Sequence, residues 1–350
     1  MKFLVVQEWD NTKGNHAGMS HMCDMLVNKY PNEYIKITKA SPIPLPTRNI
    51  VLARLIGWYD RLIWKKKWIS DYMKICKPMF SNLQKGDEVF LLEYNWPSTP
   101  QYEIAKYIRK NYPYVKIHTL SHITPTLFKR VKAEKFIPKW CAIVDTVMTM
   151  GHDLANYFNT LGVSKEKLSV GFHYVDNEYY KANESDIVLV ERPTIIAIGA
   201  LQRDFQMLAD IVNNTPEVDW IICKGRKNVD HLFRNTENVR LVGFVAEDEL
   251  LQLMLKSDAS LNVLEDTVGS NVITTSMAMG LVIIVSDVGS IRDHVDESNA
   301  IFCQNTIDSF GNAIKYLAQN PLILAEMRKA SLRKVENITI DKVHQWFNNL

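Results

Sequence analysis

The stretch ASLNVLEDTVGSNVITTSMAMGLVIIVSDVG, residues 259–289, decides the fold of this chain. It opens with an apolar run at 259–263, passes through a polar turn at 264–271 and a helical segment at 272–279, and ends in a second apolar run at 282–286. Short apolar runs on either side of a helix are typical of a β-α-β unit in a parallel sheet. The stretch therefore predicts a doubly wound α/β domain.

The same alternation of apolar runs and helical segments continues through the 350 residues. A chain of this length exceeds one ordinary core, so we expect two Rossmann-like doubly wound domains that face a central cleft. The predicted strands are Lys2–Val6, Val89–Tyr94, Val115–Leu120 and Ala142–Thr149 in the first half, and Thr194–Ile198, Asp219–Cys223, Val239–Val242, Ala259–Val263, Val282–Ser286 and Ala300–Cys303 in the second.

The domain boundary is expected where the periodicity fades. We predict an acceptor-binding domain at 1–172, a linker at 173–192 and a nucleotide-sugar-binding domain at 193–330. The last segment, 331–350, is predicted to be a helix that packs back on the first domain.

Charge is divided unevenly between the two halves. Residues 1–175 carry 25 Lys and Arg against 14 Asp and Glu, a formal charge of +11, and the remainder carries 16 against 25, or −9. This asymmetry indicates an anionic partner for the first half, or else a solvated basic face. No apolar run approaches the ~18 residues that a spanning helix needs, and the cysteines are scattered, so a cytoplasmic protein is expected.

Polar residues follow the strand at 259–263, where open parallel sheets bind their ligands. Gly269-Ser270-Asn271 opens the next helix. Unpaired amides and the helix dipole at such a position favour a phosphate group. The turn is therefore a candidate phosphate cradle, and the alternative is a helix cap without a ligand.

Three motifs in this part of the chain point to a known family. Gly269-Ser270-Asn271, Ser276–Gly280 and Ser286–Ser290 together resemble the donor-binding signature of retaining family-four GT-B glycosyltransferases, also called glycosyl transferases group 1. The similarity extends to further segments over roughly residues 140–305, namely Asn238–Val245 with Asp248–Leu250, Ile198-Gly199 with Arg203-Asp204, Asp145–Thr149, Gly162-Val163, Lys167-Leu168 and Val175-Asp176.

The resemblance implies a role for particular residues. Arg203 would clamp the diphosphate, since a planar guanidinium binds phosphate oxygens bidentately. Lys224 is a second-choice phosphate ligand, together with Arg226 and Lys227, and these side chains are otherwise solvated. The donor-binding residues expected on this basis are Gly199, Arg203, Lys224, Gly243, Phe244, Val245, Thr267, Gly269, Ser270, Asn271 and Thr275.

One departure from the family pattern concerns a Glu-x7-Glu pair. The same register places Thr267 and Thr275 at these two positions. In the family the second glutamate binds the nucleotide ribose, and a threonine lacks its reach and its bidentate acceptor geometry. Ribose binding is therefore expected to be weaker, differently arranged or absent, and a non-catalytic relative is the alternative.

In the first domain, the resemblance draws attention to one strand end and one loop. His122 follows a predicted strand where relatives place an active-site histidine that faces the donor sugar, and it is our second candidate catalytic residue beside Arg203. Gly14, His16 and Gly18 lie in the loop where relatives contact donor and acceptor; a simple turn is the alternative.

Residues 48–77 combine tryptophans with clustered cations. Such a segment favours the head-group plane of an anionic membrane, with a helix packed on its own sheet as the alternative. The residues expected at the membrane are Trp58, Trp64, Lys65, Lys66, Lys67 and Trp68.

These observations predict a metal-independent glycosyltransferase of the hexosyltransferase type, without a cofactor, peripheral on the inner face of the cell membrane. The resemblance implies a nucleotide diphosphate-sugar donor, with UDP favoured over GDP, and retention of configuration. It also implies a lipid-linked or polysaccharide acceptor in a bacterial polysaccharide, capsule or lipopolysaccharide pathway. The alternatives are a catalytically silent GT-B partner subunit and a nucleic-acid-binding protein; the acidic second half opposes the latter.

Overall fold

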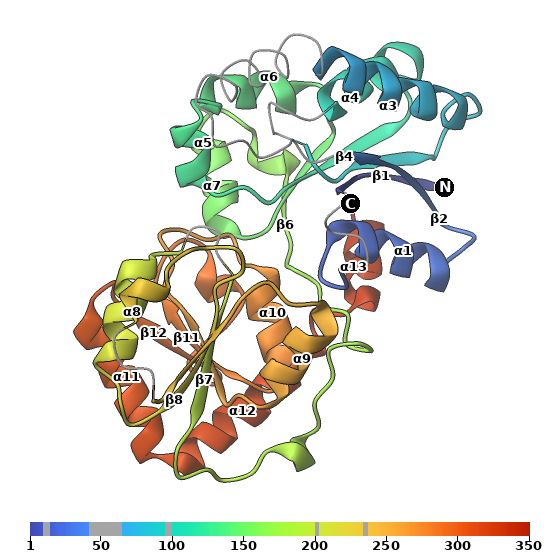
Figure 1. The fold of residues 1–350 in the computed structure, drawn as a ribbon. Coiled ribbons are helices and arrows are strands. Elements are labelled where there is room, and N and C mark those ends of the chain that lie inside the picture. Colours follow the sequence, from blue (N-terminus) through green and yellow to red (C-terminus); the bar gives the residue numbers. More distant parts are fainter. Residues whose placement is uncertain (10–14, 42–64, 95–99, 200–202, 234–236) are drawn as a thin grey trace. The chain divides into compact units, whose positions relative to one another are not determined.

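The computed structural model describes residues 1–9, 15–41, 65–94, 100–199, 203–233 and 237–350. Contacts divide the chain into two compact units (Figure 1). The first comprises Met1–Met150, Ala155–Gly171 and Phe347–Leu350, and the second comprises Gly151–Leu154 and Phe172–Trp346. Each unit holds one six-stranded parallel sheet with flanking helices, which confirms the expectation of two doubly wound domains.

The sheet of the first unit has the strand order β2-β1-β3-β4-β5-β6. Its strands are β1 (Lys2–Trp9), β2 (Tyr34–Ser41), β3 (Glu88–Leu91), β4 (Lys116–Ser121), β5 (Thr146–Thr149) and β6 (Leu168–Val170). Its helices are α1 (Met19–Lys29), α3 (Lys65–Met79), α4 (Gln101–Asn111), α5 (Pro125–Arg130), η3 (Glu134–Phe136), α6 (Ile137–Ala142), the greater part of α7 (His152–Thr160) and η4 (Lys165–Lys167).

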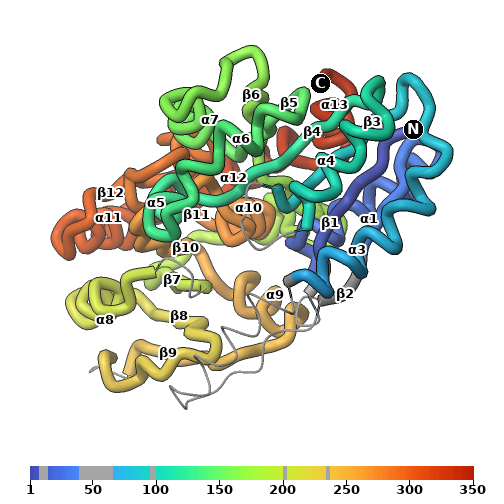
Figure 2. Tube along the Cα trace, turned by 90° about the horizontal axis from the view of Figure 1, so that it is seen from above, coloured from blue at the N-terminus to red at the C-terminus, as the bar shows by residue number. Residues whose placement is uncertain are grey.

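The sheet of the second unit has the strand order β12-β11-β10-β7-β8-β9, which Figure 2 shows along its length. Its strands are β7 (Thr194–Ile198), β8 (Asp219–Cys223), β9 (Val239–Val242), β10 (Ala259–Asn262), β11 (Val282–Ser286) and β12 (Ala300–Cys303). Its helices are η5 (Glu184–Asp186), α8 (Phe205–Asn213), η6 (Asp230–Leu232), α9 (Glu247–Leu255), α10 (Asn271–Ala278), η7 (Ile291–Asp293), α11 (Ile307–Gln319), α12 (Pro321–Val335) and most of α13 (Ile340–Asn348).

Helices cover both faces of the second sheet, with α8 and α11 on one side and α9 and α10 on the other (Figure 1). Strands β10 and β11 are buried throughout because they are covered on both faces. At the opposite end of the sheet from the polar turn, Arg328 of α12 pairs with Asp258 at 2.5 Å, and both side chains are less than a tenth exposed. Arg328 Nε also donates to the Gly280 carbonyl, so α12 is tied to the sheet by a buried ion pair.

The predicted strands of the second unit agree with the structure, apart from Val263, which lies just beyond β10. In the first unit, β2 and β6 were not expected, and the strand predicted at Ala142–Thr149 is wrong in its first part. Ala142 ends the helix α6, and extended pairing begins only at Thr146.

The ends of the units also differ from the expected boundaries. Gly151–Leu154 belongs to the second unit, which resumes at Phe172. The segment 331–350 is divided between the end of α12 and the separate helix α13. Its last residues, Phe347–Leu350, belong to the first unit, where the ring of Phe347 stacks on Phe90 with centroids 4.5 Å apart.

The strand order fixes where a ligand is expected in the second unit. From β7, the next strands β8 and β9 are added toward one edge of the sheet, whereas β10, β11 and β12 are added toward the other. The parallel neighbours β7 and β10 therefore mark the point at which the strand order reverses. Ligands of open α/β sheets bind beyond the carboxyl ends of the strands at such a switch point. The segments that follow β7 and β10 are therefore the ones that build the candidate site.

Candidate active site

Arg203 lies at this switch point. It follows β7 and forms an isolated antiparallel bridge with Leu264, the second residue after β10. Gly199, directly after β7, has φ of +94°, a left-handed conformation that glycine adopts without strain. The bridge and the turn therefore place the guanidinium of Arg203 at the carboxyl ends of β7 and β10.

Arg203 is half-buried, and no described residue places an opposite charge beside its guanidinium. Its Nη1 is buried without a hydrogen-bond partner, and no ion pair with another described residue neutralises it. Burial lowers the pKa of Arg203 to about 10, so the group is still charged at neutral pH. Because a buried, unpaired cation is costly, this arrangement favours an anionic ligand.

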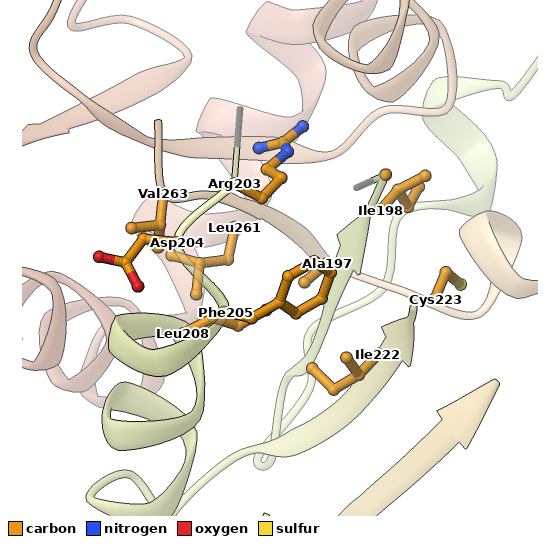
Figure 3. A pocket seen from close by; sticks show the side chains of 11 residues that line it. Ala197, Ile198, Arg203, Asp204, Phe205, Leu208, Ile222, Cys223, Leu261 and Val263 are labelled. Carbon is orange, nitrogen blue, oxygen red and sulfur yellow. The ribbon is translucent and has the colours of Figure 1, made fainter. Parts of the chain in front are cut away.

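A small pocket lies below Arg203. Figure 3 shows the guanidinium pointing away from the ring of Phe205, while apolar side chains fill the interior. The pocket has a volume of about 10 Å³, room for one water molecule. The pocket is too small for a phosphate group. An anion therefore has to approach the guanidinium from the side that faces away from Phe205.

The N-terminus of α10 is the second part of the site. Ser270 caps this helix by accepting a hydrogen bond from the Ile273 amide, and Gly269 precedes it with φ of +85°. Within the described part of the chain, the amides of Asn271 and Val272 make no hydrogen bond. These donors and the helix dipole suit a phosphate oxygen.

Arg203 and this helix end are close together. An ideal Cβ on Gly199 would lie 3.8 Å from Arg203 Nε and 3.8 Å from the Val272 side chain. Gly199 is thus the small residue that separates the cation from the first turn of α10. The structure brings together Gly199, Arg203, Gly269, Ser270 and Asn271, five of the residues expected to bind the donor.

Two histidines beside this turn were missed from the sequence. His173 Nδ1 lies 3.2 Å from Asn271 Oδ1, and His294 Nε2 lies 3.0 Å from the Val268 carbonyl oxygen. Their ring centroids are 6.0 Å apart. His173 comes from the segment before β7 and His294 from the turn after η7, so only the fold brings them to α10. No motif in the sequence indicated their position.

The loops after β8 and β9 form an adjacent part of the same sheet edge. Phe244 is 69% exposed, and the guanidinium of Arg226 lies over its ring at 4.8 Å. Gly243 is exposed and Val245 half-buried on the same loop. Lys224, in contrast, pairs with Asp230 at 2.7 Å, so its charge is already partly neutralised.

Thr267 and Thr275, at the positions of the glutamate pair, form hydrogen bonds with nearby backbone groups. Thr267 Oγ1 accepts a hydrogen bond from the Gly269 amide, and Thr275 Oγ1 donates to the Asn271 carbonyl at 2.7 Å. Both residues are less than a tenth exposed. Their hydroxyls hold the turn and the first part of α10 in shape.

In the first unit, His122 follows β4 and has a carboxylate beside it. Its Nε2 lies 3.6 Å from Glu93 Oε2, just after the neighbouring strand β3. Burial raises the pKa of Glu93, and the nearby His122 opposes that shift. Glu93 was not singled out from the sequence, because its partner lies 29 positions further along the chain.

The remaining predicted residues fall partly outside the described chain. Gly14, Trp58 and Trp64 lie outside the described residues. Gly18 is the N-cap of α1, and the rings of His16 and His21 lie 4.5 Å apart. Within α3, which Lys65 begins, Lys66 and Lys67 are exposed.

The membrane prediction is wrong for Trp68. This residue is 6% exposed and packs edge-on against Tyr72. Trp68, Tyr72 and Cys76 recur every four residues, so they form the buried stripe of α3 rather than an exposed aromatic belt. None of the helices formed by the described residues is long and apolar enough to span a bilayer.

Comparison with known proteins finds a family match for the second unit and solved structures that share the fold of the whole chain. Residues 192–320 match the family described as glycosyl transferases group 1. No curated protein sequence matches the chain. Among solved structures, the Anabaena protein HepE in complex with UDP and glucose superposes with a TM-score of 0.69 at 13% identity, covering 100% of this chain and 98% of that one.

Two further structures have the same architecture. Sucrose-phosphate synthase from Thermosynechococcus elongatus superposes with a TM-score of 0.73 at 11% identity, covering 100% of this chain and 99% of that one. The lipopolysaccharide outer core galactosyltransferase WaaB does so with a TM-score of 0.65 at 16% identity, covering 100% and 98%.

The fold defined by the two doubly wound units is therefore that of GT-B glycosyltransferases. The match to the group 1 family, at residues 192–320, lies entirely within the second unit.

Proposed function

We propose that this protein transfers a sugar from a UDP-sugar to a lipid-linked or polysaccharide acceptor in bacterial surface glycan synthesis. The observation that carries the proposal is the buried, unpaired guanidinium of Arg203 beside the open N-terminus of α10. A cation and free amides at one switch point suit the two phosphates of a nucleotide diphosphate.

UDP is the proposed donor nucleotide, with GDP as the alternative. Structures of HepE contain UDP and UDP-glucose, which supports this choice for a chain of the same fold. Phe244 and Arg226 offer an exposed ring and a guanidinium plane on the same sheet edge. A flat pyrimidine base can stack on such a surface.

The chemistry requires that a nucleoside diphosphate leaves the sugar. Negative charge then develops on the leaving phosphate oxygens, where Arg203 and the amides of Asn271 and Val272 stabilise it. This charge stabilisation needs no metal ion, and we propose a metal-independent reaction with retention of configuration. His122, next to Glu93, is the proposed catalytic residue of the first unit.

A nucleotide panel tests the proposal. UDP, GDP, ADP, CMP and dTDP at millimolar concentration are added to the native protein, to Arg203→Ala and to the control Arg240→Ala, which removes an exposed arginine from β9. Since a ligand that binds only the folded state raises the melting temperature, UDP should stabilise the native and control proteins but not Arg203→Ala. Equal stabilisation of all three would contradict the proposed clamp.

A second candidate function is nucleotide or glycan binding by a partner subunit without transfer. The two threonines favour it, because both hydroxyls serve the local backbone and neither replaces a ribose-binding carboxylate. Release of UDP from UDP-sugars by the purified protein separates the two candidates. Stabilisation by UDP without any UDP release would support the silent form.

For the cellular setting, we propose peripheral attachment to the inner face of the cell membrane. The excess of cations in residues 1–175 supports attraction to anionic lipids. Recovery of the protein in the membrane fraction at low salt, and its release at high salt, would agree with this proposal. A protein that stays in the soluble fraction at low salt would contradict it.

A further inference from the structure

The segment formed by α5, η3 and α6 in the first unit carries a cluster of cations separate from the lysines of α3. One set of side chains in this segment faces the core: Phe128, Ala133, Ile137 and Trp140 are each less than a tenth exposed. The other set is exposed and mixes cations with apolar groups. This set, here called the α5–α6 surface, consists of Lys129, Arg130, Val131, Lys132, Lys135, Phe136 and Lys139.

The lysines of the α5–α6 surface are not neutralised nearby. Within the described chain, Lys129, Lys132, Lys135 and Lys139 form no ion pair. Glu134 is the acidic residue of the segment, and its carboxylate accepts a hydrogen bond from the Tyr157 hydroxyl at 2.6 Å. The surface therefore carries a concentrated positive charge.

Apolar groups lie among these cations. Val131 and Phe136 are 40% and 39% exposed. The Phe136 ring is held in place by stacking on Trp140, with centroids 5.4 Å apart, and Lys135 lies over it at 5.1 Å. An exposed ring in a fixed position, flanked by cations, suits the boundary between lipid head groups and acyl chains.

Lys132 adds an independent observation. It ends α5 in a left-handed conformation, with φ of +54°, and is the non-glycine residue with positive φ among the described residues. The Ala133 amide donates to the Phe128 carbonyl and the Lys132 amide to the Lys129 carbonyl, the pattern of a helix end where glycine is favoured. A lysine occupies this position although the backbone conformation favours glycine, and its charge adds to the α5–α6 surface.

We propose that the α5–α6 surface docks on the anionic head groups of a lipid bilayer, with Phe136 and Val131 entering the interface. The inference deepens the membrane attachment proposed above and rests on it. It assigns that attachment to residues outside 48–77, the segment that the sequence had singled out.

A lipid bilayer fits better than a nucleic acid or a soluble polyanion. All three would engage the lysines, but phosphate backbones and free polyanions offer nothing to the exposed Val131 side chain. A bilayer takes up both the charges and the apolar groups in one surface. Competition by an RNA oligonucleotide at equal phosphate concentration distinguishes these partners.

The experiment measures cosedimentation of the full chain with vesicles of phosphatidylglycerol and phosphatidylcholine. Variant Lys132→Gln/Lys135→Gln/Lys139→Gln is compared with the matched control Lys181→Gln/Lys256→Gln/Lys315→Gln, which neutralises three exposed lysines of the second unit. Since each cation near an anionic surface contributes about fivefold, the triple variant should bind at least tenfold more weakly and the control within twofold of native.

Two single variants separate lipid binding from folding. Lys132→Gly relieves the left-handed strain, so it should bind vesicles about fivefold more weakly while its melting temperature stays equal or rises. Phe136→Ser should weaken binding without changing its salt dependence. A triple variant that binds like the native chain, binding that persists on pure phosphatidylcholine, or full displacement by RNA would overturn the proposal.

The UDP-induced thermal shift is recorded for every variant. It should be unchanged, because the nucleotide site lies in the second unit. Loss of vesicle binding with an intact UDP shift supports the α5–α6 surface. If UDP does not raise the melting temperature of the native protein, the proposal of a UDP-sugar donor is contradicted. The conclusion about vesicle binding by the α5–α6 surface does not depend on that result.

Discussion

The imidazole of His294 lies directly against Gly269, so that a Cβ on residue 269 would come within 2.4 Å of Nε2. The histidine is held there because its Nε2 bonds to the Val268 carbonyl at 3.0 Å. Gly269 also has φ of +85°, which other residues adopt only with strain. The turn before α10 therefore depends on glycine for two separate reasons.

Gly269→Ala should consequently damage the turn that faces the phosphates. We expect a loss of about 1–3 kcal/mol in the free energy of unfolding and at least tenfold weaker UDP binding. Urea denaturation and calorimetric titration measure the two effects. The double variant Gly269→Ala/His294→Ala removes the clash but not the strain, so it should recover only part of the loss. Native-like UDP affinity in Gly269→Ala would show that this turn does not contact the nucleotide.

Thr275→Val tests whether this threonine replaces the ribose-binding glutamate. Its hydroxyl already donates to the Asn271 carbonyl inside α10. We expect a small loss of stability, about 1 kcal/mol, and UDP affinity within twofold of native. A tenfold loss of UDP affinity with little change in stability would instead assign Thr275 to the ribose.

Arg328→Met should destabilise the second unit without touching the site. The substitution leaves Asp258 as a buried carboxylate whose remaining hydrogen bond comes from the Thr194 amide. We expect a loss of about 3–5 kcal/mol in the free energy of unfolding. The paired variant Arg328→Met/Asp258→Asn should regain part of it. A free energy of unfolding within about 0.5 kcal/mol of native, measured by urea denaturation, would contradict the importance of this ion pair.

Glu93→Gln should change how stability depends on pH. Burial raises the pKa of Glu93, so the folded state favours the protonated form. The stability that this group contributes is complete below its unfolded pKa of about 4.5 and is lost as pH rises through the folded pKa. Compared with native protein, Glu93→Gln should therefore gain relative stability between pH 4.5 and neutrality. Parallel pH profiles of the two proteins would show that Glu93 has an ordinary pKa.

The strands of the second unit were predictable because most of them are buried on both faces. Runs such as Val282–Ser286 are apolar, short and bounded by polar residues, and the structure agrees with them. The two missed strands, β2 and β6, lie at the edges of the first sheet. In β2, Lys36 and Lys39 interrupt the apolar pattern, and β6 has three residues, too few for a periodicity.

The site was predictable only where one segment carries it. Gly269, Ser270 and Asn271 are adjacent in the sequence, so their motif identifies them. His173 and His294 lie 98 and 26 residues away from their partners Asn271 and Val268, and only the packing of the turns around α10 brings them there. The position of Arg203 was expected from the motif after β7, but its missing counter-charge is a property of the folded chain.

The most direct test of the account compares UDP, UMP and uridine by calorimetric titration in native protein and in Arg203→Ala. If the buried guanidinium binds the diphosphate, its removal costs about 1.5–3 kcal/mol, so UDP affinity falls about 10- to 100-fold while uridine affinity stays within threefold. An equal loss for UDP and uridine, or an unchanged affinity for UDP, would contradict the assignment of Arg203 as the diphosphate clamp.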